Sequence, residues 1–416
     1  MRIDVIHVLL IEDDPEDALL ARKLLTRRTD YRFDVRCADS LQAGIALLDE
    51  ATDAVLLDLS LPDAQGWETF ARLLAAAPHV PIVLLTGHDD EQLSMKAIQE
   101  GAQDYLLKND LNASVLQRGI RHAIERKRTE EQLQELAEEL RAKNDQVAEE
   151  LELAREMQQA LLPQRYPVFP AGVEPGRSAL RFAHTYRASQ FLGGDFVNIR
   201  AVSDTAACVF ICDVMGHGVR SALVTATVRG LLEETGAMAH TPGLLLTELN
   251  RALREVTKRP GQLVFASAAC LLIDVGRRRL SYAIAGHPCP LYLAADGACR
   301  PIDPGLPSVE PALGLFPDQA FTTFHRPLSA GDRFLTFTDG LFEVEDAAGA
   351  PYGKDRVLAS ARSHAGLELD GLVQALVDDA TAFAGGRGLE DDVCVVGIRV
   401  ERLAPATQQD TAGASR

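Results

Sequence analysis

Residues 117–162 contain no proline and no turn signal after Gly119, and this stretch predicts one long helix. Apolar side chains recur at every seventh position and charged side chains fill the other faces, as in a coiled coil. Lys143 and Glu150 interrupt the seam, so its register is weakly specified. The pattern predicts a helical coiled-coil linker and a homodimer through residues 132–161, with a solvated spacer helix as the alternative. The seam consists of Leu133, Leu136, Leu140, Val147, Ala154, Met157 and Leu161.

A chain of 416 residues exceeds what a single hydrophobic core supports, so we expect one domain on each side of this helix. We place the domains at residues 1–116 and 163–400, joined by the linker at 117–162. Residues 401–416 contain few apolar side chains and predict a disordered tail.

Charge and composition restrict the partners of the chain. A net charge of −18 argues against nucleic acid, whose phosphates require basic surfaces. No apolar run reaches membrane-spanning length and the N-terminus lacks the features of a signal peptide, so we expect a cytoplasmic protein without a membrane partner. The seven cysteines form no CxxC pair and are expected to be reduced, with Cys208, Cys212, Cys270 and Cys394 in buried strands.

The first domain alternates short apolar runs with amphipathic segments, which predicts a doubly wound α/β fold with a five-stranded parallel sheet. The expected strands are residues 5–11, 33–37, 54–58, 80–85 and 103–107. In such a sheet the functional site lies at the carboxyl ends of the strands.

Chemically distinctive residues stand at these strand ends. Glu12 and Asp13 follow the first strand, and Asp58 ends the third. Converging carboxylates form a hard oxygen site that suits Mg²⁺, and one of them can act as a nucleophile toward phosphorus. Thr86 and Lys108 end the fourth and fifth strands, where a hydroxyl and an ammonium group can offset the charge of a phosphoryl group.

These residues, in the motifs LLIEDD, LLDLSLPDAQGWE, LLTG and DYLLKND, resemble the receiver domain of two-component response regulators. The resemblance implies that Asp58 is the phosphoacceptor, that Glu12, Asp13 and Asp58 bind Mg²⁺, and that a histidine kinase is the partner. It also implies that Thr86 and Tyr105 form the switch pair and that Lys108 contacts the phosphate. Asn109 departs from the proline that the family commonly has after this lysine, and a cis bond there would cost about 3 kcal/mol.

In the second domain, the sequence indicates strands before and after two long helices. This order predicts an α+β β-sandwich. The expected strands are residues 180–186, 206–213, 264–274, 280–284, 333–338 and 393–400, and the helices are residues 220–234 and 242–256. A hairpin is expected at residues 276–279.

Five aspartates lie in turns next to these strands, in the motifs GGD, CDVMGHG, TFTDG and LEDDV. They are Asp195, Asp213, Asp339, Asp391 and Asp392. Ligation by oxygen alone favours Mg²⁺ or Mn²⁺ over Zn²⁺. Two such ions can activate a water and hold a phosphoryl group, so the set predicts hydrolysis of a phosphomonoester.

With AGHP and the LARE and QQALLP segments, these motifs resemble the PPM-type metal-dependent serine/threonine phosphatases of the SpoIIE and RsbU branch. The resemblance implies that Asp195, Asp213, Asp339 and Asp391 are catalytic and bind two Mn²⁺ or Mg²⁺ ions, with the Val214 carbonyl as a further ligand and Asp392 in support. The implied substrate is a phosphorylated anti-anti-sigma-type protein. Asn198 stands where the branch usually has Asp, which predicts weaker binding of an accessory ion.

His217 and His287 each lie in a turn with glycine, where a structural hydrogen bond is a more frequent role than general acid catalysis. The sequence therefore predicts a response regulator whose phosphorylation controls a phosphatase. One alternative is a phosphorylation-gated adaptor that binds a sigma factor or its regulator without turnover. A cyclase, suggested by GGDF at residues 193–196, is rejected because the later motifs do not fit it.

Overall fold

The computed structural model describes residues 5–27, 31–87, 91–189, 191–216, 218–257, 264–295, 297–302, 310–387 and 389–404. The chain divides into two compact units, Met1–Gln146 and Val147–Arg416. Helix α5 (Ala113–Leu161) begins in the first unit and ends in the second. In the described part of the chain, every helix is too short or too polar to cross a membrane.

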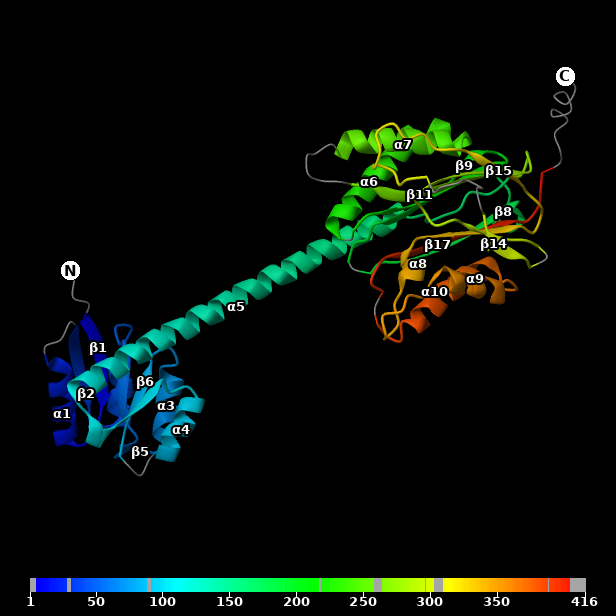
Figure 1. The fold of residues 1–416 in the computed structure, drawn as a ribbon. Coiled ribbons are helices and arrows are strands. Elements are labelled where there is room, and N and C mark those ends of the chain that lie inside the picture. Colours follow the sequence, from blue (N-terminus) through cyan, green and yellow to red (C-terminus); the bar gives the residue numbers. More distant parts are fainter. Residues whose placement is uncertain are drawn as a thin grey trace, which may run out of the picture. The chain divides into compact units, whose positions relative to one another are not determined.

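The first unit contains the expected five-stranded parallel sheet, in the order β2-β1-β3-β6-β7 (Figure 1). The prediction of a doubly wound α/β fold is confirmed. Its strands are β1 (Val5–Ile11), β2 (Arg32–Ala38), β3 (Ala54–Asp58), β6 (Ile82–Thr86) and β7 (Asp104–Leu107). A small hairpin of β4 (Ser60–Leu61) and β5 (Ala64–Gln65) follows β3.

Helices cover both faces of this sheet, which is why its central strands are apolar throughout. The start of α5 packs with α1 on one face, where Leu116 and Ile120 meet Leu25. The other face is covered by α2, α3 and α4, through residues such as Phe70. These helices are α1 (Pro15–Thr26), α2 (Leu41–Leu47), α3 (Trp67–Ala76) and α4 (Glu91–Gln99).

The second unit is an antiparallel β-sandwich, as predicted, with the sheet orders β15-β12-β11-β10-β9 and β14-β13-β16-β17-β8. The strands of the first sheet are β9 (Asp195–Ser203), β10 (Ala206–Val214), β11 (Ala266–Asp274), β12 (Arg279–Ala285) and β15 (Phe324–Pro327). Those of the second are β8 (Leu180–Arg187), β13 (Leu291–Leu293), β14 (Cys299–Pro301), β16 (Arg333–Phe337) and β17 (Val393–Val400).

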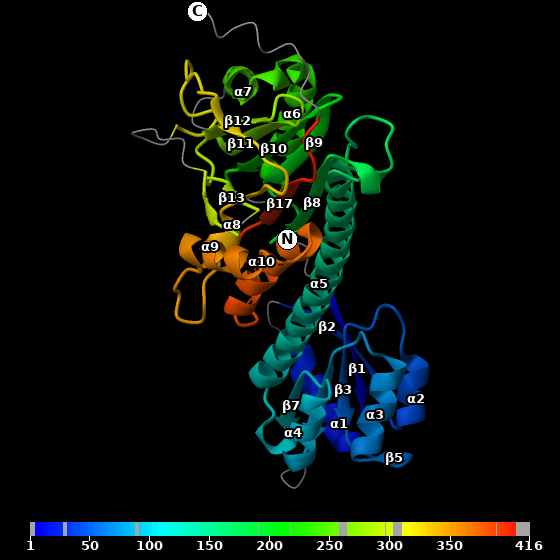
Figure 2. The same ribbon diagram turned by 90° about the vertical axis from the view of Figure 1, so that its right-hand side faces the viewer.

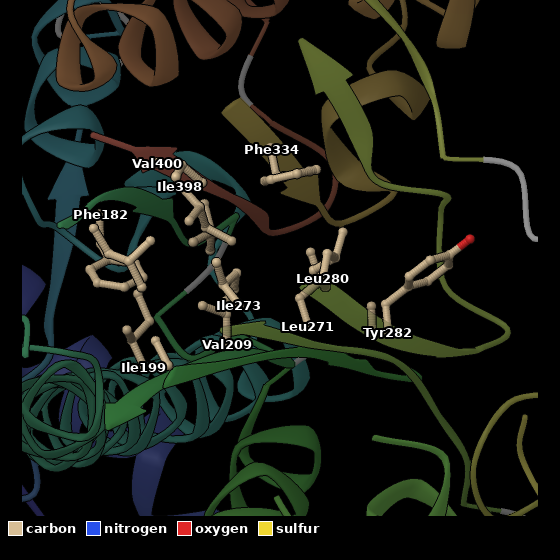
Figure 3. Close-up of a cluster of buried hydrophobic side chains, with 14 of the residues drawn as sticks. Phe182, Ile199, Val209, Leu271, Ile273, Leu280, Tyr282, Phe334, Ile398 and Val400 are labelled. Carbon is tan, nitrogen blue, oxygen red and sulfur yellow. The ribbon is translucent and has the colours of Figure 1, made fainter. Parts of the chain in front are cut away.

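Side chains from both sheets interlock in the main core of this unit (Figure 3). Val209 and Leu271 come from the first sheet, and Phe334 and Ile398 from the second. Helices α6 and α7 cover the outer face of the first sheet, while α9 and α10 cover that of the second (Figure 2). The helices of this unit are α6 (Val219–Glu234), α7 (Pro242–Thr257), α8 (Gly340–Glu343), α9 (Lys354–Ser363) and α10 (Leu369–Phe383).

The structure adds elements to those expected from the sequence, namely β9, β13, β14, β15 and helices α8 to α10. In the predicted tail, the Glu401 N–H donates to the Ala179 carbonyl and the Ala404 N–H donates to the Val275 carbonyl. Residues 401–404 are therefore hydrogen-bonded to the folded unit. The rest of that tail lies outside the described residues.

Candidate metal centres

The carboxyl ends of β1 and β3 bring three carboxylates together in the first unit. Ligand oxygens of Glu12, Asp13 and Asp58 all lie within 4.8 Å of one another, with Glu12 and Asp58 buried and Asp13 exposed. Asp14 takes no part, because its carboxylate caps helix α1 by accepting from the N–H groups of Glu16 and Asp17. The predicted Mg²⁺ ligands therefore do converge.

Lys108, at the end of β7, reaches into this carboxylate group. Its Nζ lies 2.6 Å from Asp58 Oδ2, 2.8 Å from Glu12 Oε2 and 3.0 Å from Asp17 Oδ2. Burial lowers the pKa of Lys108, but the bonds to the three carboxylates prevail and raise it above the ordinary value. Asp17 lies on α1 and was not expected from the sequence.

Glu12 is held in an environment that disfavours its negative charge. Burial and, to a smaller extent, the charge of Asp58 raise its pKa, the Lys108 hydrogen bond lowers it, and the net pKa is about 7. A divalent cation would offset both the cost of burying this charge and the repulsion from Asp58, because the carboxylate oxygens of Glu12, Asp13 and Asp58 are the hard ligands that it prefers. The acidic group therefore fits a Mg²⁺ ion.

The remaining predicted receiver residues lie at the end of β6, within β7 and just after β7. The Thr86 hydroxyl is buried and has no hydrogen-bond partner among the described residues, so it is available to donate to a new ligand. Tyr105 is half-buried beside the core under α4. Asn109 lies in the short 3₁₀ helix Lys108–Asp110, and its peptide bond is not among the cis bonds of the described chain.

In the second unit, two predicted ligands face each other across neighbouring strands. Asp195 begins β9 and pairs with Asp213 near the end of β10. Asp195 is only 2% exposed, and its Oδ2 accepts a 2.7 Å hydrogen bond from the Thr338 hydroxyl. Its Oδ1 is buried without a hydrogen-bond partner in the described chain. A buried carboxylate oxygen of this kind is costly unless a cation binds it.

The other predicted ligands act on the same pair electrostatically. Burial and then the charges of Asp339, Asp391 and Asp392 raise the pKa of Asp213 to about 8. Burial and the charge of Asp213 raise the pKa of Asp195 well above its ordinary value. The arrangement gathers negative charge that a hard cation would neutralise, and its oxygen donors suit Mg²⁺ or Mn²⁺.

These carboxylates are more widely spaced than those of the first unit. Within the described residues, the group Glu12, Asp13 and Asp58 is the one in which three ligand atoms lie within 4.8 Å of one another. A more widely spaced set of acids fits two ions better than one.

Asp392 has both carboxylate oxygens engaged by the protein. Its Oδ1 accepts from the N–H and hydroxyl of Ser189, and its Oδ2 accepts a 2.6 Å bond from the Gly194 N–H. The Asp392 N–H donates in turn to Asp391 Oδ1 at 2.8 Å. Asp392 thus ties the GGD turn to the turn that carries Asp391.

The glycines of these motifs are required by close packing. A Cβ at Gly194 would lie 2.5 Å from the Val214 carbonyl oxygen and 3.2 Å from Asp213 Oδ1. A Cβ at Gly340 would collide with the Asp392 carbonyl oxygen. The Val214 carbonyl therefore lies directly against the GGD turn.

His287 and Asn198 differ from the acids in their surroundings. His287 is buried, its Nδ1 lies 2.7 Å from the Ser267 hydroxyl, and burial lowers its pKa to about 3, which favours the neutral imidazole. His217 lies outside the described residues. Asn198 is three residues beyond Asp195 on β9, and strand alternation directs it to the opposite face.

Comparison with known proteins gives a family match in each of the two units. Residues 8–121 match the family described as the response regulator receiver domain, and residues 203–401 match the family described as stage II sporulation protein E (SpoIIE). The chain joins a response regulator receiver domain to a SpoIIE-type PP2C phosphatase domain. The predicted families are therefore confirmed, and both imply bound metal ions.

Individual relatives match less than half of this chain. Phosphoserine phosphatase RsbP of Bacillus subtilis is 28% identical over 195 residues, which are 47% of this chain and 45% of RsbP. The chain thus spans less than half the length of this relative. The uncharacterized transcriptional regulatory protein YxjL of Bacillus subtilis is 30% identical over 154 residues, which are 36% of this chain and 70% of YxjL.

A solved structure supports the fold of the second unit. The SiaA-PP2C domain of Pseudomonas aeruginosa matches with a TM-score of 0.53 and 23% sequence identity, over 62% of this chain and 98% of that one. The similarity extends over nearly the whole of that domain. It establishes the PP2C-type fold for this unit.

Proposed function

We propose that this protein is a metal-dependent protein serine/threonine phosphatase whose activity is controlled by phosphorylation of Asp58. The main support is the buried, unpartnered Oδ1 of Asp195, next to Asp213, whose pKa is raised by burial and by the charges of Asp339 and Asp391. We assign Asp195, Asp213, Asp339 and Asp391, with the Val214 carbonyl, as ligands of two Mn²⁺ or Mg²⁺ ions. The bound ions would neutralise the phosphoryl oxygens and lower the pKa of the attacking water.

The roles of the protein side chains follow from this assignment. Thr338 donates to Asp195 and fixes which of its oxygens faces the ions. Asp392 holds the GGD turn in place through the Gly194 N–H. Water attacks phosphorus opposite the seryl or threonyl oxygen, the bond from phosphorus to that oxygen breaks, and the oxygen takes up a proton.

On the receiver, Asp58 is the proposed nucleophile toward a phosphohistidine of a partner kinase. A carboxylate oxygen of Asp58 would bond to phosphorus while the bond to the histidine nitrogen breaks, which leaves an acyl phosphate. Lys108, which already contacts Asp58, and the unpartnered Thr86 hydroxyl would bind the new phosphoryl oxygens. Helix α5 would carry the resulting change into the phosphatase unit.

For the substrate we propose a phosphoserine or phosphothreonine on an anti-anti-sigma-type protein. The name of RsbP, a phosphoserine phosphatase, supports the bond type, and the substrate protein is assigned by family resemblance. We also propose the functional division 1–116, 117–162 and 163–400, with a cytoplasmic location.

The test is hydrolysis of p-nitrophenyl phosphate by the full-length protein, with and without Mn²⁺ and with and without a small-molecule phosphodonor for the receiver. We expect turnover that requires Mn²⁺ and changes with the phosphodonor. A folded protein that binds partners but shows no turnover in any condition would instead support the adaptor alternative.

We expect Gly194→Ala to weaken Mn²⁺ binding. Its new methyl group would press on the Val214 carbonyl and Asp213, and overpacking of this kind costs about 1–3 kcal/mol. Calorimetric titration with Mn²⁺ measures the effect. Gly230→Ala, within α6 and with open space around the added Cβ, is the matched control and should bind Mn²⁺ like the wild type. Equal affinity in both variants would contradict the position assigned to the ions.

We also expect a homodimer through α5. Residues 132–150 are all exposed, and the stripe includes Leu140 at 57% and Val147 at 53% exposure, which a partner helix would bury. Light scattering should give twice the chain mass. Leu136→Lys with Leu140→Lys should give a monomer, whereas Glu138→Lys with Asp145→Lys, on the outer face, should stay dimeric. A wild-type monomer at micromolar concentration would exclude this dimer.

A further inference from the structure

One buried polar side chain links the end of α5 to the metal-binding turn. Gln158 is only 8% exposed, although its neighbours Met157 and Gln159 are exposed. Its side-chain Nε2 donates a 2.7 Å hydrogen bond to the Gly193 carbonyl, and its Oε1 accepts a 3.1 Å bond from the Gly193 N–H. The amide thus satisfies both backbone groups of one residue in the GGD motif.

The turn held by Gln158 is packed tightly against the site. A Cβ at Gly193 would collide with Tyr186 and with Asp392. The next residue, Gly194, donates to Asp392, and its carbonyl accepts from the Thr225 hydroxyl at 3.0 Å and from the Val214 N–H at 3.1 Å. Asp195 follows directly. A displacement of Gly193 therefore moves the backbone that carries Asp195.

The last turn of α5 has a second attachment. The Arg229 guanidinium, on α6, donates to the Leu161 carbonyl at 2.5 Å, and the Leu161 side chain packs against the core beneath α6. Gln158 and Leu161 lie three positions apart on the helix, which places them on one face. This face of α5 contacts both the GGD turn and α6.

We propose that Gln158 is a positioning residue that transmits the position of α5 to the metal ligand Asp195. This inference rests on the function proposed above and names the contact through which the receiver would act. A hydrogen bond weakens steeply once its length and angle leave a narrow range, so a small shift or rotation of α5 would release the Gly193 backbone. The free turn would then hold Asp195 less firmly.

The experiment compares Gln158→Ala, Gln158→Glu and Gln159→Ala in the full-length protein. Gln158→Glu keeps the acceptor for the Gly193 N–H but loses the donor to the carbonyl. Gln159→Ala removes an exposed side chain and is the matched control. Three quantities are measured: Mn²⁺ affinity by calorimetry, melting temperature without metal, and the change in p-nitrophenyl phosphate turnover caused by the phosphodonor.

We expect both Gln158 variants to bind Mn²⁺ about tenfold more weakly, as when residues that orient metal ligands are removed. Their response to the phosphodonor should be lost, and Gln159→Ala should match the wild type. Wild-type affinity and response in folded Gln158 variants would overturn the positioning role alone. A wild type that neither binds Mn²⁺ nor turns over substrate would instead overturn the proposed function, and this inference with it. If Gln158→Ala does not fold, the Mn²⁺ affinity and phosphodonor response of Gln158→Glu test the positioning role.

Discussion

Asp213→Asn should abolish phosphomonoester hydrolysis while leaving the fold intact. The substitution keeps the size of the side chain but removes the negative charge from the centre of the carboxylate group, next to Asp195. Removing residues that only orient metal ligands lowers metal affinity or activity by about 10–100-fold. Loss of a ligand itself should therefore lower kcat/KM by more than about 100-fold. The measurement is Mn²⁺-dependent turnover of p-nitrophenyl phosphate.

The melting temperature supplies the control for this variant. Without metal, Asp213→Asn should melt no lower than the wild type, because it removes a charge that Asp339 and Asp391 repel. Mn²⁺ should raise the melting temperature of the wild type, because it binds the folded state, but should have little effect on the variant. Near-wild-type turnover by a well-folded Asp213→Asn protein would refute the metal assignment.

Most of the fold was predictable because burial leaves a simple pattern in the sequence. Strands β1 and β3 were predicted with the observed bounds, since a parallel strand covered on both faces is apolar throughout. Helices α6 and α7 were predicted within one residue at each end. Helix α10 was missed although Leu369, Leu372, Val373, Leu376 and Val377 repeat with helical spacing and are all buried.

Other elements carry little local signal. Strands β13 and β14 have three residues each, which is too short for an alternating pattern to be recognised. β9 begins at Asp195, directly after two glycines, and its polar residues obscure the alternation. β9 and β14 pair with the strand next to them in sequence, β10 and β13, and only β13 also pairs with a distant strand, β16. Their weak local signal therefore explains why they were missed.

Distance along the chain separates the predicted site residues from those that were missed. The acids were found because each stands beside a strand end in a recognisable motif. Asp17, Ser189 and Gln158 were missed, because their roles depend on contacts with residues 91, 203 and 35 positions away. Thr338 lies inside the TFTDG motif, where a hydroxyl next to a metal-ligand candidate was the available clue.

Asp58→Ala should abolish the response to a phosphodonor and leave basal Mn²⁺-dependent turnover unchanged. The variant lacks the carboxylate that would receive the phosphoryl group, whereas Lys108 keeps its bonds to Glu12 and Asp17 and so remains paired. The Asp195 site lies in the other compact unit and keeps all its groups.

Two measurements test whether Asp58 is the phosphoacceptor. Incorporation of acid-labile phosphate from the phosphodonor should fall to background in Asp58→Ala, and turnover should be the same with and without the phosphodonor. Asp63→Ala is the matched control: its carboxylate accepts the N–H groups of Leu41 and Gln42, away from Lys108, so this variant should still take up phosphate and respond. A phosphodonor response that persists in Asp58→Ala would show that the phosphoryl group is received at another residue. Within the described receiver, Asp58 is the one carboxylate that both lies 2.6 Å from Lys108 and belongs to the group of Glu12, Asp13 and Asp58.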